Sequence, residues 1–419
     1  MPQDGPIPEE NEILKKNMIA GAALLLSLVT STATAQTEGP SDSRAGANGA
    51  MQNQSGTHGS EEDAMVYNQG IDALNSKHYK DAEEYFSKYL KNNGQNAQAH
   101  KMLANTLFQE NQPALAVPQL EAALKISPKD IEARDNLGAA YLQIGSFDKA
   151  AALYHSARLR SPKDAQLALY EGLALTQAGK LDEAVVALKD AVRLDPKNPN
   201  AFLQQGVALE GGGKHAEAAT AFQSAADLSP KDPRAALYTG TLNQNLGNNA
   251  VAIPYLMRAI ALGTDNPFAA HMSLGNAYAA SGKDAEALAE FQSASDAKPE
   301  DFGAAANLGT LSQKAGHKPQ AEAAYRRALA APALEPRIAA PIQSNLALML
   351  VAEGKLEAAA TLLSSATQGD PTSAPLQENL GLVLERQNKT DQAIAAYQKA
   401  LQLDPTLPTA KESLARLKK

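Results

Sequence analysis

The chain has 419 residues, of which 82 are alanine, none is cysteine or tryptophan, and 5% are aromatic. The absence of cysteine excludes disulfides, zinc–thiolate sites, thiol catalysis and a lipid-modified N-terminal cysteine. Charged residues make up 20% of the chain and the formal net charge is -8, so bulk charge indicates neither a disordered acidic polymer nor a nucleic-acid-binding protein. With so few large side chains, a core of closely packed, alanine-rich helices is expected.

The N-terminus has the layout of a secretory signal peptide. Lys15-Lys16 precedes an apolar run from Met18 to Val29, and small residues follow, ending in Ala33-Thr34-Ala35. The run of 12 residues is shorter than the roughly 20 that a membrane-spanning helix needs. We therefore expect residues 1–35 to be removed on export, which places the mature chain in the periplasm or outside the cell. The alternatives are an uncleaved membrane anchor formed by residues 18–34 and a buried helix.

Residues 36–62 are expected to form a flexible linker. They consist mostly of Gly, Ser, Asn, Gln and Thr, and they hold almost no apolar side chain beyond small alanines. Such a stretch cannot offset the entropy lost on ordering it.

A repeat of 34 residues organises the rest of the chain. Ser-Pro or Asp-Pro recurs at this spacing, with the prolines at Pro128, Pro162, Pro196 and Pro230 and again at Pro371 and Pro405. Counting this proline as position 32 gives ten units over residues 63–405, beginning at 63, 97, 131, 165, 199, 233, 268, 302, 340 and 374. Internal repeats of this length are typical of stacked supersecondary units.

Four positions of the unit are nearly invariant. Position 20 is alanine in all ten units, position 24 is always large and apolar, and position 27 is alanine in nine, with Tyr89 the exception. These offsets mark one face of a helix. Position 8 is glycine in eight units, with Ala104 and Ala347 in the other two. Because glycine inside a helix costs about 1 kcal/mol relative to alanine, we expect two helix backbones to approach closely there, with the alanine at position 20 facing the glycine.

Each unit is predicted to be a helix–turn–helix hairpin. Turn signals such as Ala-Gly-Lys at 178–180 end the first helix (helix A), and the proline at position 32 ends the second (helix B). The pattern resembles the tetratricopeptide repeat, in Leu-Gly at positions 7 and 8 (Leu137-Gly138, Leu308-Gly309), in tyrosine at position 11 (Tyr141), and in positions 20, 24, 27 and 32. The resemblance implies an all-α, right-handed superhelical solenoid of about ten stacked hairpins.

Three features depart from a regular array. Pro118 and Pro254 stand at position 22 and should bend their B helices slightly. The join at 330–341 holds three prolines and is expected to interrupt regular stacking. Residues 406–419 are expected to form a capping helix with a polar outer side.

No motif for catalysis, metal binding or cofactor binding is found. The seven histidines are dispersed singly, so a metal site would need a coincidence of tertiary approach, and solvated or partly packed histidines are the simpler interpretation. The glycines at 211–213 resemble a phosphate loop, but Ala208 stands where the first glycine belongs and His215 replaces the Ser or Thr. We therefore predict no catalytic residue, no metal ligand and no cofactor.

The remaining candidate is a binding surface on the A helices. By the resemblance, positions 2, 5, 9, 12 and 13 of helix A line a concave groove that receives an extended peptide or a partner helix. The candidate residues in or beside this groove are Lys101, Asn105, Asn136, Gln143 and Gln166, with Leu169, Leu203 and Leu237 as apolar contacts for a partner. Amide side chains suit hydrogen bonding to a peptide backbone, but they are equally ordinary on exposed helices.

Some proteins of the resembled family grip a C-terminal carboxylate with five groove residues. Lys101, Asn105 and Asn136 match that set, but Gln166 and Tyr170 fill the last two places, which disfavours such a clamp here.

The function favoured by the sequence is that of a non-catalytic scaffold in the cell envelope that binds a protein partner. The alternative is an accessory subunit of an envelope secretion, polysaccharide or enzyme complex whose catalytic part is on another chain. Binding of nucleic acid is disfavoured by the sequence pI of about 5.5 and by the lack of a basic stripe. The partner's identity, the biological process and the oligomeric state stay open.

Overall fold

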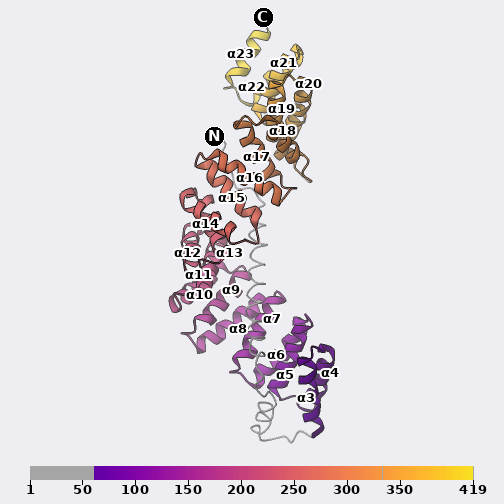
Figure 1. Ribbon diagram of the computed structural model, residues 1–419, viewed down its shortest axis with the longest axis vertical. Coiled ribbons are helices and arrows are strands. Elements are labelled where there is room, and N and C mark those ends of the chain that lie inside the picture. Colours follow the sequence, from indigo (N-terminus) through magenta and orange to yellow (C-terminus); the bar gives the residue numbers. More distant parts are fainter. Residues whose placement is uncertain (1–60, 333, 419) are drawn as a thin grey trace. The chain divides into compact units, whose positions relative to one another are not determined.

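The structure is a computed structural model that describes residues 61–332 and 334–418. These residues form 21 helices, α3 to α23, and no strand (Figure 1). The predicted signal peptide, and all of the predicted linker except its last two residues, lie outside the described residues. Helix α3 begins at Glu61, two residues before the expected start of the first unit.

All ten predicted units are helical hairpins. The A helices are α3 (Glu61–Asn75), α5 (Ala97–Gln109), α7 (Ile131–Gln143), α9 (Ala165–Gln177), α11 (Pro199–Gly211), α13 (Pro233–Asn245), α15 (Pro267–Ala280), α17 (Phe302–Lys314), α19 (Pro336–Ala352) and α21 (Ala374–Arg386). The B helices are α4 (Tyr79–Asn92), α6 (Pro113–Ile126), α8 (Phe147–Arg160), α10 (Leu181–Leu194), α12 (His215–Leu228), α14 (Asn249–Ala261), α16 (Asp284–Ala297), α18 (Lys318–Leu329), α20 (Leu356–Gly369) and α22 (Thr390–Leu403).

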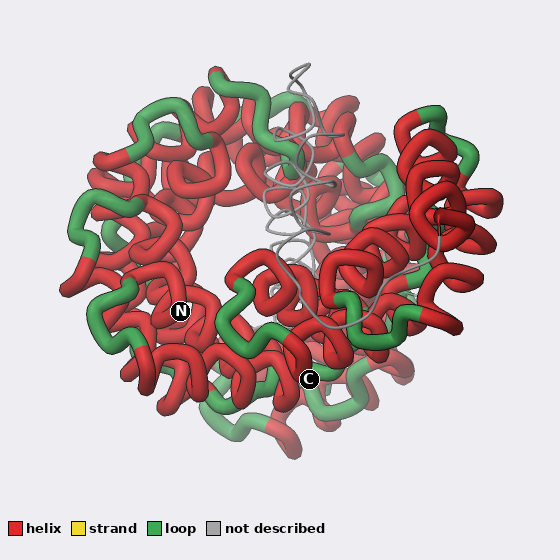
Figure 2. The backbone as a smooth tube through the Cα atoms, turned by 90° about the horizontal axis from the view of Figure 1, so that it is seen from below, coloured by secondary structure: helices red, strands yellow, loops and turns green. Residues whose placement is uncertain are grey.

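The chain divides into two compact parts, Met1–Leu228 and Ser229–Lys419, whose described residues carry hairpins 1–5 and hairpins 6–10. We call them the first and the second array. Within each array, helix B of one hairpin packs against helix A of the next, and neighbouring A helices such as α9 and α11 or α13 and α15 touch. Figure 2 shows the helix pairs in red, joined by short green loops. The expected fold class, an all-α array of stacked hairpins, is confirmed.

Local backbone chemistry explains where the helices begin and end. Position 15, in the turn from helix A to helix B, has a positive φ in all ten hairpins, and it is glycine in seven of them. Glycine adopts this left-handed conformation without steric cost. At position 34, an Asn or Asp side chain accepts a hydrogen bond from a backbone N–H in the first turn of the next A helix, from α5 through α17. Each such N-cap stabilises its helix by about 1 kcal/mol.

The invariant positions form the core, and the side chain nearest to the position-8 glycine is that of position 24. The alanine at position 20 is fully buried in every hairpin, and the side chain at position 24 is at most 2% exposed. A β-carbon on Gly206 would lie 2.5 Å from the ring of Phe222, the position-24 residue of the same hairpin. The other seven position-8 glycines likewise have their own position-24 side chain nearest. The nearest side chain to Gly206 is therefore that of Phe222, and the expected contact of Gly206 with Ala218, at position 20, stays a prediction.

The two prolines at position 22, the join at 330–341 and the C-terminal cap are all part of helices or lie between them. Helices α6 and α14 continue through Pro118 and Pro254. In the join, α18 ends at Leu329 and α19 begins at Pro336, so Pro341 lies inside a helix and the interruption is shorter than expected. The predicted capping helix is α23 (Pro408–Leu417), which packs on α22 and whose Ala410 N–H donates to Glu378 Oε1 on α21 at 2.9 Å.

Gly206→Ala is expected to lower the free energy of unfolding. The added methyl group overfills the contact with Phe222, which lowers the free energy of unfolding by about 1–3 kcal/mol. The higher helix propensity of alanine offsets about 1 kcal/mol of this loss. Gly211→Ala on the same helix is the matched control, because a β-carbon there would meet only the end of the Leu181 side chain, at 3.3 Å. Urea unfolding measures both variants, and equal effects at the two positions would contradict the close contact.

Candidate functional site

Lys101, the first of the predicted groove residues, is buried and ion-paired. Only 8% of its side chain is exposed, and its Nζ lies 3.0 Å from Asp130 Oδ2 and 2.6 Å from Glu132 Oε2. Asp130 is also the N-cap of α7, where it accepts from the Ala133 N–H. The charge of Lys101 is therefore balanced within the chain, and the side chain joins α5 to the start of α7.

The five predicted groove residues fall into two groups. Asn136 is buried and donates to Asn105 Oδ1 at 3.3 Å, so these two amides, like Lys101, connect α5 and α7. Gln143 on α7 and Gln166 on α9 are exposed. A peptide role for the five residues stays a prediction, and the two glutamines are the most exposed of the five.

The three leucines expected to contact a partner are part of the core. Leu169 is 2% exposed, Leu203 is 4% exposed and Leu237 is 8% exposed. The expectation of accessible leucines is wrong, because helix A is covered both by its own helix B and by the neighbouring A helix. Position 5 therefore lies at the edge of the core in these hairpins.

The pKa shifts of Lys101 and Asp130 agree that both groups are charged. Burial by itself lowers the pKa of Lys101, but its hydrogen bonds to Glu132 and Asp130 raise that pKa above the ordinary 10.5. Burial by itself raises the pKa of Asp130, but the Ala133 N–H and the Lys101 ammonium lower that pKa below the ordinary 3.8. The contribution of Asp130 to the free energy of unfolding is thus present above pH 3.8 and is lost as the pH falls through its folded pKa. The contribution of Lys101 is present below pH 10.5 and is lost as the pH rises through its folded pKa.

We expect Lys101→Met to lower the free energy of unfolding by about 2 kcal/mol at pH 7, because two carboxylates lose their buried partner. The difference from the unaltered chain should shrink as the pH falls below 3.8 and through the lowered pKa of Asp130. Denaturant unfolding from pH 3 to pH 7 measures it, with Lys125→Met, an exposed lysine on α6, as the control. A difference that stays constant over this range would show that the ion pairs are not its cause.

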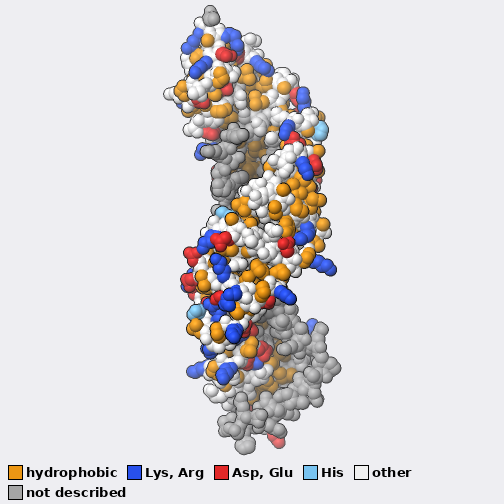
Figure 3. Space-filling view, turned by 90° about the vertical axis from the view of Figure 1, so that its left-hand side faces the viewer, with side chains coloured by type: hydrophobic (Ala, Val, Ile, Leu, Met, Phe, Trp, Pro, Cys, Tyr) orange, Lys and Arg blue, Asp and Glu red, His pale blue; other side chains and the backbone are white. Residues whose placement is uncertain are grey.

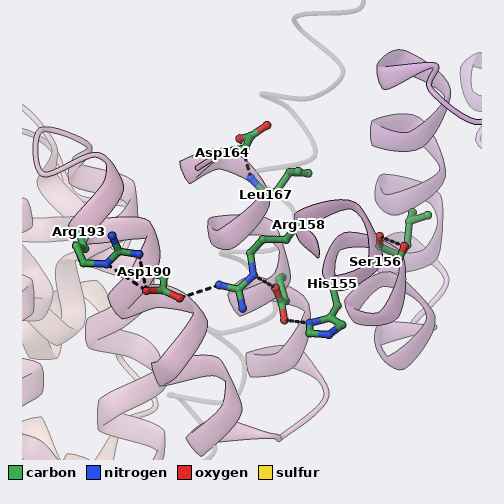
Figure 4. A network of polar contacts seen from close by, with 9 residues as sticks. His155, Ser156, Arg158, Asp164, Leu167, Asp190 and Arg193 are labelled. Carbon is green, nitrogen blue, oxygen red and sulfur yellow. Dashed lines mark hydrogen bonds and ion pairs between the residues drawn. The ribbon is translucent and has the colours of Figure 1, made fainter. Parts of the chain in front are cut away.

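A second polar network links three consecutive helices (Figure 4). Glu171 on α9 is 5% exposed, with Oε1 lying 2.7 Å from His155 Nδ1 and Oε2 lying 2.6 Å from Arg158 Nε, both on α8. Arg158 also contacts Asp190 on α10 at 3.0 Å, and Arg193 contacts the other oxygen of Asp190. Hydrogen bonds from Arg193 and Arg158 outweigh partial burial and lower the pKa of Asp190.

The buried carboxylate of Glu171 was not predicted, although its position in the repeat indicates it. It occupies position 7, where six other hairpins have leucine. A lone carboxylate there would be strongly unfavourable, and the arginine and histidine of α8 compensate it. The network therefore links α8, α9 and α10.

Within the described residues, no group of three or more His, Asp or Glu side chains is arranged to hold a metal ion. In the same part of the chain, no helix is long and apolar enough to cross a membrane.

Two sequence models, both described as tetratricopeptide repeat, match the chain almost end to end from residue 67. One matches residues 67–131, 136–199, 179–233, 203–267, 239–302 and 307–374, and the other matches residues 375–407. The chain belongs to the tetratricopeptide repeat (TPR) family. Proteins of this family bind protein partners and are generally non-catalytic scaffolds. No curated protein matches the sequence.

Several solved structures are similar to the chain at low sequence identity. A tetratricopeptide repeat protein from Parabacteroides merdae is 17% identical, with 61% of this chain and 100% of that chain covered and a TM-score of 0.44. The APC/C hetero-tetramer Cut9-Hcn1 is 15% identical, with coverage of 88% and 98% and a TM-score of 0.41. Yeast Tom70 is 15% identical, with coverage of 85% and 95% and a TM-score of 0.35.

Proposed function

We propose that this TPR protein is an exported, non-catalytic scaffold that binds a segment of a partner protein on the A helices of the first array. The observation that carries the proposal is the side-by-side arrangement of successive A helices, which is tied together by the contacts of Lys101 and Asn136 and leaves other polar side chains exposed. Family membership supports a protein partner. The signal-peptide pattern at residues 1–35 supports export to the cell envelope.

The binding surface in this proposal runs over α5, α7 and α9. Its outward amides are Gln143 and Gln166, while Lys101, Asn105 and Asn136 support it from beneath by linking α5 to α7. Neutral hydrogen bonds contribute about 1 kcal/mol each, so affinity is modest and spread over several contacts. A protein partner also suits the mixed surface charge, since acidic and basic side chains are interspersed on the face shown in Figure 3.

The double variant Gln143→Ala with Gln166→Ala should weaken partner capture tenfold or more, which corresponds to about 1.4 kcal/mol. Both side chains are exposed, so helicity and thermal unfolding should not change. Photo-crosslinking residues placed at 143 and 166 in the full chain identify the partner from envelope fractions, and capture is then measured with that purified partner.

The control positions are Gln223 and Thr220, which are exposed on helix α12. Adducts from position 223 and none from 143 or 166 would place binding on the B helices and refute the proposed surface. The identity of the crosslinked protein decides between a general scaffold and the alternative, an accessory subunit of a secretion, polysaccharide or enzyme complex.

Export has a separate test. Cleavage after Ala33-Thr34-Ala35 gives a mature chain that begins at Gln36. The removed segment carries four acidic and two basic residues, so the net charge changes from -8 to -6. Intact-mass measurement of protein from the native host checks this, and a full-length product in the cytoplasm would contradict export. A full-length product in the membrane fraction would instead favour an anchor at residues 18–34.

A further inference from the structure

The cations on the two edges of the first array differ in whether they have partners. On the edge formed by the turns from helix A to helix B, Lys180 pairs with Asp148 at 2.7 Å and Lys214 pairs with Asp182 at 2.9 Å, so each lysine joins two consecutive hairpins. The opposite edge is formed by the turns from helix B to the next helix A. We call its exposed cations in hairpins 2–4 the basic edge, and they are Lys125, Lys129, Arg160, Lys163 and Lys197.

The acidic side chains in the turns of the basic edge form contacts inside the chain. Asp130, Asp164 and Asp195 are half-buried, and each accepts a hydrogen bond from a backbone N–H two or three residues later. The cations of the basic edge are exposed, and within the described residues none of their side chains forms an ion pair or a hydrogen bond. This edge therefore presents positive charge to its surroundings.

Helix stability does not account for the three lysines at position 33. A cation near the C-terminus of a helix is stabilised by the helix dipole, which explains Lys125 and Arg160 in the last turns of α6 and α8. Lys129, Lys163 and Lys197 each stand one residue before the N-cap of the next A helix, where the same dipole disfavours a cation. They are 34 residues apart in the sequence, so only the stacking of hairpins brings them into one row, and this row was not predicted.

The basic edge also holds the two most exposed large apolar side chains of the described residues. Leu159 is 71% exposed and directly precedes Arg160 near the end of α8. Ile131 is 64% exposed and stands two residues after Lys129, at the start of α7. Helices α7 and α8 form the third hairpin, so the start of one and the end of the other lie at the same edge. Aliphatic side chains beside unpaired cations suit a partner that is anionic at its surface and apolar beneath it.

We propose that the first array docks through its basic edge onto a membrane surface that contains anionic phospholipids. Lysine and arginine side chains are attracted by the negative surface potential of such a membrane. Leu159 and Ile131 enter the boundary between the headgroups and the acyl chains. A nucleic acid or a purely acidic peptide would also meet the cations, but it would leave these two aliphatic side chains in water.

The spacing and the sign of the charges support this docking. The axes of packed helices lie about 8–10 Å apart, which is close to the Debye length of about 8 Å at physiological ionic strength, so cations on successive hairpins act together. The chain as a whole carries a net charge of -8. An anionic surface therefore attracts this edge and repels the rest of the chain, which fixes the orientation of the docked protein.

The first test compares binding of the full chain to vesicles of phosphatidylglycerol with phosphatidylcholine and to vesicles of phosphatidylcholine alone. The ratio of the two binding constants, measured by co-sedimentation, removes any contribution of the apolar run at residues 18–29. Lys129→Glu with Lys163→Glu and Lys197→Glu should lower this ratio tenfold or more, with an unchanged circular dichroism spectrum. High salt should lower the ratio for the unaltered chain as well, because it screens the cations.

The control is Lys80→Glu with Lys399→Glu and Lys411→Glu, which changes the net charge equally at exposed positions outside the basic edge. It should lower the ratio much less. Equal losses in the two triple variants, or a ratio near one for the unaltered chain, would overturn the proposal.

The second test measures insertion. The chain has no tryptophan, so Leu159→Trp introduces a single fluorophore, whose emission should shift to shorter wavelength on anionic vesicles. Val186→Trp is the matched control, since Val186 is 62% exposed on α10 outside the basic edge and should give no shift. No shift at position 159, or equal shifts at both positions, would overturn the proposal. Binding of duplex DNA or polyglutamate without binding of anionic vesicles would overturn it too, because the edge would then take a soluble polyanion.

Discussion

The contact between the two helices of each hairpin is the constraint on which the rest of the structure depends. Helix B inserts a large side chain at position 24 against the backbone of helix A at position 8, as Phe222 does against Gly206. In all hairpins, position 24 is Leu, Phe or Tyr and is nearly inaccessible to solvent. Because proteins are packed to a uniform density, a β-carbon at position 8 has no room where the ring lies closest. Glycine is retained there at a cost in helix propensity of about 1 kcal/mol.

Polar contacts then connect one hairpin to the next. The position-34 side chains cap seven A helices, and Asp130 does this while also pairing with Lys101 of the preceding hairpin. Glu171 connects the third hairpin to the fourth through Arg158. Lys101, Asp130, Glu171 and Arg158 are each buried or half-buried, and each has an opposite partner, which is the condition under which buried charge does not destabilise a protein. In a solenoid each repeat touches only its neighbours, so such contacts act locally.

Most of the fold was predictable from spacing, whereas the state of the site residues was not. Ten-fold recurrence of positions 8, 20, 24 and 27 predicted every hairpin, because the same packing problem is solved ten times. The contact of position 24 with the position-8 glycine was not predicted, since spacing does not give the crossing of two helices or the direction in which a side chain extends. Lys101 was predicted to be available to a partner. Its pairing with Glu132, 31 residues away, depends on how neighbouring A helices align, which no single repeat reveals.

The positions that build the fold are separate from the positions that vary between hairpins. Positions 8, 20, 24 and 27 face inward and are nearly constant, so they carry little information about a partner. Positions 5, 6, 9 and 12 of helix A differ from hairpin to hairpin, with Lys101, Asp135 and Glu210 in the first array and no charge in hairpins 6–9 of the second. The same hairpin fold accommodates both charged and uncharged side chains at these positions. Stability of the hairpin therefore does not determine which kind of side chain is present. Under the proposed function, specificity resides in those side chains of the A helices that are exposed, such as Gln143 and Gln166.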